Sequence, residues 1–205
     1  MKKRYLVLTV VLALSVGTGS YVLSFGNNSK EVSTLQNNTQ TGHIHGKVQD
    51  YPFSESVKRA TLIVKIKIKD KDHELDTPTV AKTIFNADIQ EIYKDAKNLG
   101  KQSIKVMQHG NSKFSFNDND LFKKDEVLVL FLREAEGFDN TYWLVGEETN
   151  FYKVLDNKVT KQAIMDVELK DVEIEIKKLN NKEVQVMDLE KFTKKIKDKV
   201  KEQNS

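Results

Sequence analysis

The sequence predicts a mainly β fold: a small antiparallel OB-like barrel followed by a C-terminal amphipathic helix. Most of its apolar segments alternate with polar residues at a period of two, which is typical of strands with one buried face. Turn-forming residues separate consecutive segments, and no strand–helix–strand alternation appears between them. Closure into a five-stranded barrel removes sheet edges on which other chains could pair, so a barrel is preferred and a sandwich is the alternative.

The first strands follow a short helical turn expected at 54–60. The segment that begins at Leu62 carries apolar residues on one face and lysines on the other. The apolar residues are Leu62, Val64, Ile66 and Ile68, and the lysines are Lys65, Lys67 and Lys69. A charged loop is expected at 70–77, a second strand at 79–93 with a bulge at Glu91-Ile92, and a third strand at 102–108.

The middle of the chain contains the strongest strand signal. Residues 126–133 include an unbroken apolar run that is too short for a helix and predicts a central strand buried on both faces. Further strands are expected at 141–145 and 151–155. Asp156-Asn157-Lys158 then predicts a hairpin turn into Val159, and alternation at 167–176 predicts another strand.

The C-terminal segment predicts a helix over 187–202 with Asp188 as its N-cap. Acidic residues at its start and lysines toward its end suit the helix dipole. An apolar stripe recurs at helical spacing and either packs in the core or docks a partner. The stripe consists of Leu189, Phe192, Ile196 and Val200.

The N-terminus predicts delivery across a membrane. Three basic residues precede an apolar run that extends to Phe25, and no further charge occurs before Lys30. Residues 1–25 therefore fit a cleaved signal peptide or a signal anchor, with the rest of the chain outside the cytoplasm, secreted or membrane-anchored. The polar segment 26–50 predicts a flexible linker, and 51–205 a single domain that meets the membrane only through the N-terminal segment.

Charge and cysteine content restrict the class of function. The leader holds three of the 33 basic residues, which leaves 30 basic against 30 acidic residues in the exported part. That balance argues against nucleic-acid binding, which requires a basic surplus. The chain has no cysteine, which excludes disulfides and thiolate metal sites.

Two surfaces could bind a ligand. The aromatic residues Tyr142, Trp143, Phe151 and Tyr152 lie close in sequence and could form a ligand platform on a barrel, although core packing is the more ordinary interpretation. Lys65, Lys67 and Lys69 could form a stripe for an anionic polymer such as a teichoic acid, or for lipid headgroups. A solvated outer face is the simpler interpretation of that stripe.

Other candidate chemistry is weak. His43 and His45 could hold a transition metal, but no third ligand is near them in sequence. The run Asn117-Asp118-Asn119-Asp120 suggests a calcium loop, but glycine and glutamate are missing from the required positions, so an Asx turn is expected. Nucleophile-elbow, zinc-protease and phosphate-loop motifs are absent. We predict no catalytic, metal or cofactor-binding residues and no cofactor.

The middle of the chain carries a series of turn-and-core motifs: Gln108-His109-Gly110, 121–126 (LFKKDE), 142–146 (YWLVG) and 151–154 (FYKV). Over about 57–159 this order resembles a group of uncharacterised exported OB-like proteins of Gram-positive bacteria. The group's pattern has glycines where this chain has Lys124-Asp125 and Asn111. The expected shape is also similar to the barrel of secreted tissue metalloproteinase inhibitors, whose N-terminal cysteine this chain lacks. The resemblance therefore implies fold and export but no activity or functional residue.

These observations together predict an exported, non-enzymatic cell-surface or secreted domain that binds a protein or an envelope component. An accessory or structural subunit that docks a partner through its C-terminal helix is the alternative. An enzyme of unfamiliar type is the third possibility.

Overall fold

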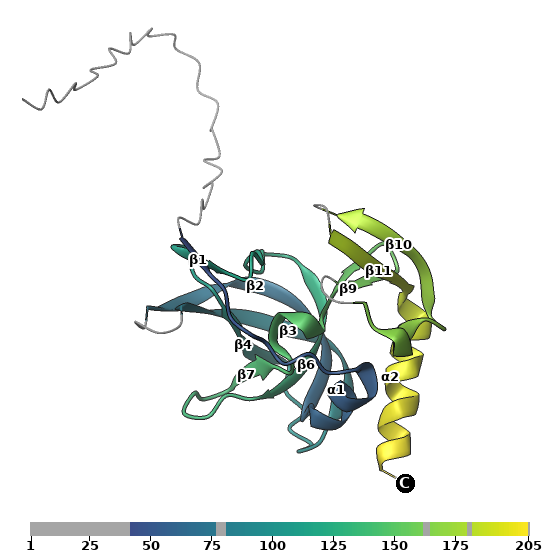
Figure 1. Ribbon diagram of the computed structural model, residues 1–205. Helices are drawn as coiled ribbons and strands as arrows, with labels where there is room; N and C mark the ends of the chain where they lie inside the picture. Colours follow the sequence, from purple (N-terminus) through teal and green to yellow (C-terminus); the bar gives the residue numbers. More distant parts are fainter. Residues whose placement is uncertain (1–41, 77–80, 162–164, 180–181, 205) are drawn as a thin grey trace, which may run out of the picture. The chain divides into compact units, whose positions relative to one another are not determined.

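Five strands close into a barrel in the computed structural model, which describes residues 42–76, 81–161, 165–179 and 182–204 (Figure 1). The barrel strands are β2 (Leu62–Asp76), β3 (Ala81–Asp95), β4 (Ser103–His109), β6 (Val127–Glu134) and β7 (Thr141–Leu144). They follow the order β2-β3-β4-β7-β6, and β6 pairs with β2 to complete the ring. β4 and β7 run parallel, whereas the other neighbours in the ring are antiparallel. The predicted OB-like barrel is confirmed.

β6 separates two hydrophobic cores, which explains its unbroken apolar run. Leu128, Leu130 and Leu132 belong to the barrel core. Val129 and Phe131 belong to a second core outside the barrel, formed with the helices. Because successive side chains of a strand point to opposite faces, both sets need apolar residues. The prediction that this strand is buried on both faces is confirmed.

A sheet arm continues from β6 beyond the barrel. Its strands, in spatial order, are β8 (Phe151–Leu155), β9 (Lys158–Lys161), β11 (Lys182–Asp188) and β10 (Glu173–Leu179). The turn between β8 and β9 has φ of 48° at Asp156 and 60° at Asn157. A two-residue hairpin turn requires such left-handed conformations, which asparagine and aspartate tolerate. The predicted turn is confirmed.

The second core is covered by two helices, α1 (Phe53–Arg59) and α2 (Leu189–Gln203). Asp188 caps α2 as predicted, since its Oδ1 accepts a hydrogen bond of 2.9 Å from the Lys191 N–H. Phe192 and Ile196 are buried, and the other two residues of the apolar stripe pack against the same core. The stripe is therefore part of the core, which answers the question that the sequence left open.

Two segments of the expected domain, 51–205, differ from the sequence-based expectations. β2 continues through the expected loop at 70–77 as far as Asp76, because the charged residues there pair with β3 in a solvent-exposed ribbon. The expected strand at 167–176 begins only at Glu173. Before it, Val167–Leu169 form a 3₁₀ helix, η2, which Asp166 caps. The first 3₁₀ helix, η1, spans Glu147–Asn150.

The expected bulge in β3 is confirmed. The β2–β3 register shifts on both sides of Glu91 and Ile92. Each shift leaves one residue of β3 without an opposed partner on β2, which is how a bulge bends a barrel strand.

The C-terminal part of the expected linker at 26–50 contains a strand. Within it, β1 (Gly42–Ile44) pairs in parallel with β5 (Phe114–Phe116). A Cβ at position 42 would lie 2.5 Å from Phe114 Cδ1, so any larger residue there would displace the Phe114 ring. The leader at 1–25 lies outside the described residues. Among the residues that are described, no helix has the length and apolar character to cross a membrane.

Candidate functional site

The four aromatic residues proposed as a ligand platform do not share one surface. Tyr142 and Phe151 are buried in the barrel core, whereas Tyr152 is buried in the second core. Trp143 is half-buried beside the His109 ring, with a centroid distance of 4.9 Å. Core packing thus describes three of the four residues.

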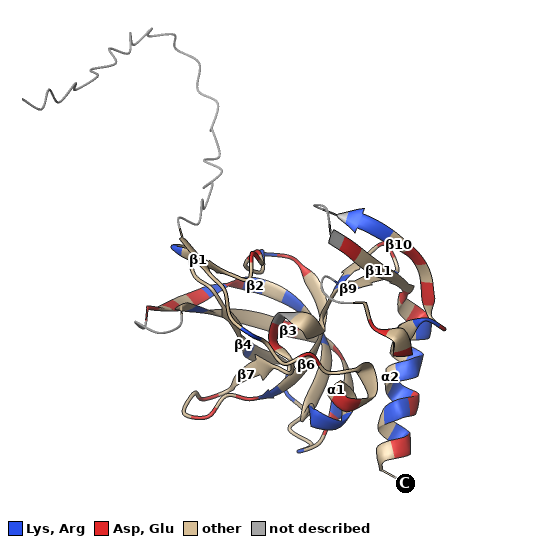
Figure 2. Cartoon of the chain, in the orientation of Figure 1, with Lys and Arg blue, Asp and Glu red and all other residues tan. Residues whose placement is uncertain are grey.

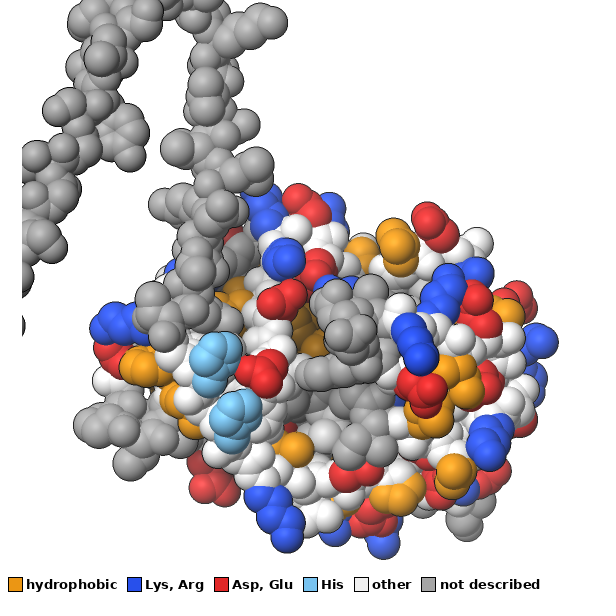
Figure 3. All heavy atoms as spheres, turned by 45° about the horizontal axis from the view of Figure 1, so that its top comes forward, with side chains coloured by type: hydrophobic (Ala, Val, Ile, Leu, Met, Phe, Trp, Pro, Cys, Tyr) orange, Lys and Arg blue, Asp and Glu red, His pale blue; other side chains and the backbone are white. Residues whose placement is uncertain are grey.

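Each lysine of the β2 stripe has an acidic neighbour. Lys65 lies 3.5 Å from Glu91, Lys67 lies 2.7 Å from Asp125 and Lys69 lies 3.6 Å from Asp88. Such exposed pairs add little stability, but they offset the positive field that an anionic polymer would need. Lysines and acidic residues are also intermixed on the face of the molecule in Figure 3.

His43 lies in β1 and His45 directly follows that strand, and their rings are stacked with centroids 6.4 Å apart. His43 Nδ1 is 2.9 Å from Asp118 Oδ1 and 3.0 Å from Ser115 Oγ. Asn117 Oδ1 accepts a bond of 3.0 Å from the Gly46 N–H. The Asn117–Asp118 turn therefore holds the β1 segment against the barrel. Among the described residues, no group of three or more histidine and acidic side chains is arranged to hold a metal ion.

A groove of about 690 Å³ lies along α2, between that helix and the α1 and η2 segments. Its lining combines four lysines with four carboxylates, and includes the buried apolar side chains of Phe53 and Val172. The lysines are Lys191, Lys194, Lys195 and Lys199, and the carboxylates are those of Glu168, Asp171, Asp198 and Glu202. In Figure 2, α2 carries basic and acidic residues along its length.

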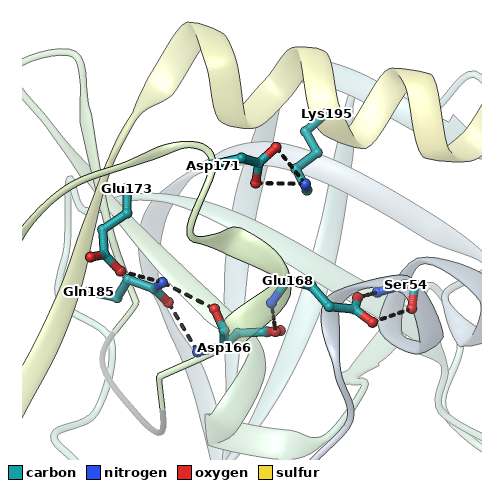
Figure 4. Close-up of polar contacts among 7 residues, drawn as sticks. All are labelled: Ser54, Asp166, Glu168, Asp171, Glu173, Gln185 and Lys195. Atoms are coloured by element: carbon teal, nitrogen blue, oxygen red, sulfur yellow. Dashed lines mark hydrogen bonds and ion pairs between the residues drawn. The ribbon is translucent and has the colours of Figure 1, made fainter.

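One wall of the groove is held by a cap supplied from far along the chain. Pro52, which precedes α1, makes no side-chain cap. Glu168 instead accepts bonds from the Ser54 N–H at 2.7 Å and from Ser54 Oγ at 2.9 Å (Figure 4). A carboxylate there satisfies a free N–H in the first turn of α1 and suits its dipole. η2 and α1 are therefore fixed to each other.

The opposite wall is fixed by Lys195, which donates to both oxygens of Asp171 at 2.7 and 2.8 Å (Figure 4). This hydrogen bond lowers the pKa of Asp171. The hydrogen bond from Lys194 likewise lowers the pKa of Asp198. These two groove carboxylates are therefore anionic at neutral pH.

A buried polar row behind the groove positions η2. Tyr152, Lys161 and Gln185 oppose one another across β8, β9 and β11. The Gln185 amide accepts from the Asp166 N–H and donates to the Asp166 C=O, both at 3.1 Å, and its Nε2 also donates to Glu173 at 2.7 Å (Figure 4). Asp166 in turn caps η2, and η2 carries Glu168. Burial lowers the pKa of Lys161 and raises that of Asp166.

Lys161→Met is expected to flatten the rise of stability with pH, because methionine fills a similar volume and carries no cation whose burial costs free energy. The folded-state pKa of Lys161 lies below its unfolded value of 10.5. Between those two pKa values the unfolded chain binds more protons, so the lysine makes wild-type stability rise with pH. Urea denaturation at pH 7 and pH 9.5 should show a smaller rise for Lys161→Met. Lys97→Met, at an exposed ion pair with Glu134, is the control that keeps the wild-type slope. A rise of stability between these two pH values that is as steep in Lys161→Met as in the wild type would contradict the prediction.

Sequence reasoning missed the groove residues because no local motif links them. Ser54 and Glu168 are 114 residues apart, and Asp171 and Lys195 are 24 residues apart. The available signal was the alternation of lysines with acidic residues on the polar face of the C-terminal helix. No protein-family model matches the chain, and no curated protein matches its sequence significantly.

Proposed function

We propose that this protein is an exported, non-enzymatic binding domain, secreted or held at the cell surface, whose groove along α2 binds a polar segment of a protein partner. The observation that carries the proposal is the groove itself. Its volume of about 690 Å³ lies in the range of ligand sites. Its four lysines and four carboxylates match a peptide segment with charges of both signs better than a uniformly anionic polymer.

The charged side chains of the groove can exchange their ion pairs within the chain for ion pairs with a partner. Lys194 and Asp198 pair at 2.6 Å, yet their side chains are 76% and 49% exposed. Exposed pairs of this kind contribute little free energy. A partner that offers its own carboxylate to Lys194 and its own cation to Asp198 therefore replaces them at small cost.

The groove carboxylates support binding over acid catalysis. The lowered pKa values of Asp171 and Asp198 keep both groups ionised at neutral pH. A general acid needs a pKa close to the working pH. These groups are suited to accept hydrogen bonds from a partner's lysine, arginine or backbone N–H groups.

In the accessory-subunit alternative, the partner docks on a different face of α2 from the apolar stripe. The apolar stripe of α2 is packed in the second core. A partner that docks on α2 therefore meets the lysine-bearing face, which is the face that lines the groove.

Export is supported by the leader sequence. Lys2, Lys3 and Arg4 precede a long apolar run, as in signal peptides and signal anchors. The resemblance of 57–159 to exported proteins of Gram-positive bacteria agrees with this location. An envelope component remains the alternative ligand.

Photo-crosslinking on intact cells tests the proposal. A benzophenone amino acid at Lys194 is expected to yield a discrete protein adduct that a protease removes. The same group at Lys123, an exposed position outside the groove lining, should not give that adduct. Charge reversal at Lys191 and Lys199 should abolish it. Identical adducts from both positions, or an adduct degraded only by enzymes that cleave envelope polymers, would overturn the proposed protein partner.

A further inference from the structure

β10 forms one end of the nine-stranded sheet (Figure 1). The opposite end of the strand order, β7, pairs back onto β6 and so has its edge closed. Among the described residues, β10 pairs only with β11. Its outer side therefore presents backbone N–H and C=O groups on which another strand can pair.

The side chains of β10 differ from those of the exposed ribbon that the end of β2 forms with β3. In β2, residues 69–73 are all charged or histidine and all exposed. This pattern is a common protection of sheet edges. In β10, by contrast, Ile174 is 52% exposed and Ile176 is 49% exposed. Apolar side chains on an open edge leave surface that a further strand would bury.

The charges of β10 are complementary to those of a second copy of β10 that runs in the opposite direction. Glu173 and Glu175 lie in its first half, and Lys177 and Lys178 in its second half. Antiparallel pairing of two copies about Ile176 places Glu175 of one copy opposite Lys177 of the other. It also places the two Ile176 side chains opposite each other.

Neighbouring registers lack this match. The β10–β11 register shifts between Glu173 and Glu175 and is regular from Glu175 to Leu179. In this regular part, backbone groups point outward at alternate residues, so the nearest other symmetric registers centre on Glu175 or on Lys177. Those registers oppose two glutamates or two lysines, which is destabilising. Glu173 cannot compensate freely, because Gln185 Nε2 already donates to its carboxylate at 2.7 Å.

We propose that two copies of this chain pair through antiparallel β10 strands, in the register centred on Ile176, to form a two-fold symmetric dimer. Glu175 lies 3.1 Å from Lys177 and 3.3 Å from Lys158 within its own chain. Both pairs are exposed, so Glu175 can also contact the second copy's Lys177. Each copy uses its single β10 edge, so the assembly closes at two copies. This dimer is independent of the groove along α2.

Cysteine crosslinking tests the register, because the chain contains no cysteine of its own. In the proposed dimer, the two Cα atoms of residue 176 lie about 4.5–5.5 Å apart, which suits a disulfide. Full-length Ile176→Cys is expected to run as a covalent dimer on non-reducing gels after mild oxidation. Lys178→Cys is the matched control on the same face of the strand, where the two Cα atoms lie about 14 Å apart. Equal crosslinking of the two variants, or none in Ile176→Cys, would overturn the proposal.

A charge swap in the Ile176→Cys background provides a second readout. Glu175→Lys alone or Lys177→Glu alone converts both intermolecular attractions into repulsions and should slow crosslinking roughly tenfold. Combining the two changes restores opposite charges across the interface, and crosslinking should recover. Failure of the combined variant to recover would show that the pairing does not use these residues.

Discussion

Phe192→Ala is expected to lower the free energy of unfolding by about 4 kcal/mol. Phe192 is buried at the centre of the second core, where its ring lies 6.1 Å from that of Phe53 and 4.7 Å from that of Tyr152. Truncation removes these contacts and leaves a cavity between α2 and the sheet arm. Urea denaturation followed by far-UV circular dichroism measures the loss.

Lys194→Ala serves as the control on the exposed face of α2, where a change within about 0.5 kcal/mol is expected. Removal of residues 188–205 should be more severe than Phe192→Ala, since it also exposes the rest of the second core to water. A truncated domain that keeps a cooperative unfolding transition would contradict the assignment of α2 to the core.

Leu130→Ala is expected to lower the free energy of unfolding by about 3 kcal/mol. Leu130 is buried in the barrel core, on the side of β6 opposite Val129 and Phe131. Loss of its side chain weakens β6, which both cores share. Fluorescence of Trp143, the only tryptophan in the chain, reports on the barrel, while circular dichroism at helical wavelengths reports on α2.

The two probes should give the same transition midpoint for Leu130→Ala, because damage on one face of β6 is transmitted to the other. Leu155→Ala, at an exposed residue in the β8–β9 hairpin, should leave both midpoints near the wild-type value. Separate midpoints for fluorescence and circular dichroism would show that the barrel and the second core unfold independently.

The predictable parts of the fold are those specified by local patterns. Alternation from Leu62 to Lys69 identifies the first barrel strand, and the continuous run in 126–133 identifies the strand with two buried faces. Asp188 gives the start of α2 because capping depends on residues within one turn. In each case, the residues that determine the structure are neighbours along the chain.

The unpredicted parts depend on distant partners. β1 and β5 are short and pair across a long stretch of sequence. The strand pattern from Val167 onward is overridden because Asp166 caps η2 and Gln185 holds the backbone of Asp166. A short alternating segment cannot reveal either contact.

The candidate site was less predictable than the fold. The aromatic residues are close in sequence, which suggests one surface, but alternate strand positions place them in different cores. Along β2 alone the lysines form a positive stripe, but in the fold a carboxylate from another segment lies beside each of them. The groove results from the meeting of α1, η2 and α2, so its residues can be recognised only in three dimensions.

The dual role of β6 also governs how this domain can change over evolutionary time. Leu130 and Phe131 are adjacent in the chain, yet each must fit a different set of neighbours. Substitutions at one position call for compensation among the barrel strands, and substitutions at the next call for compensation in the helices. Covariation among related chains should therefore divide this strand residue by residue into two groups.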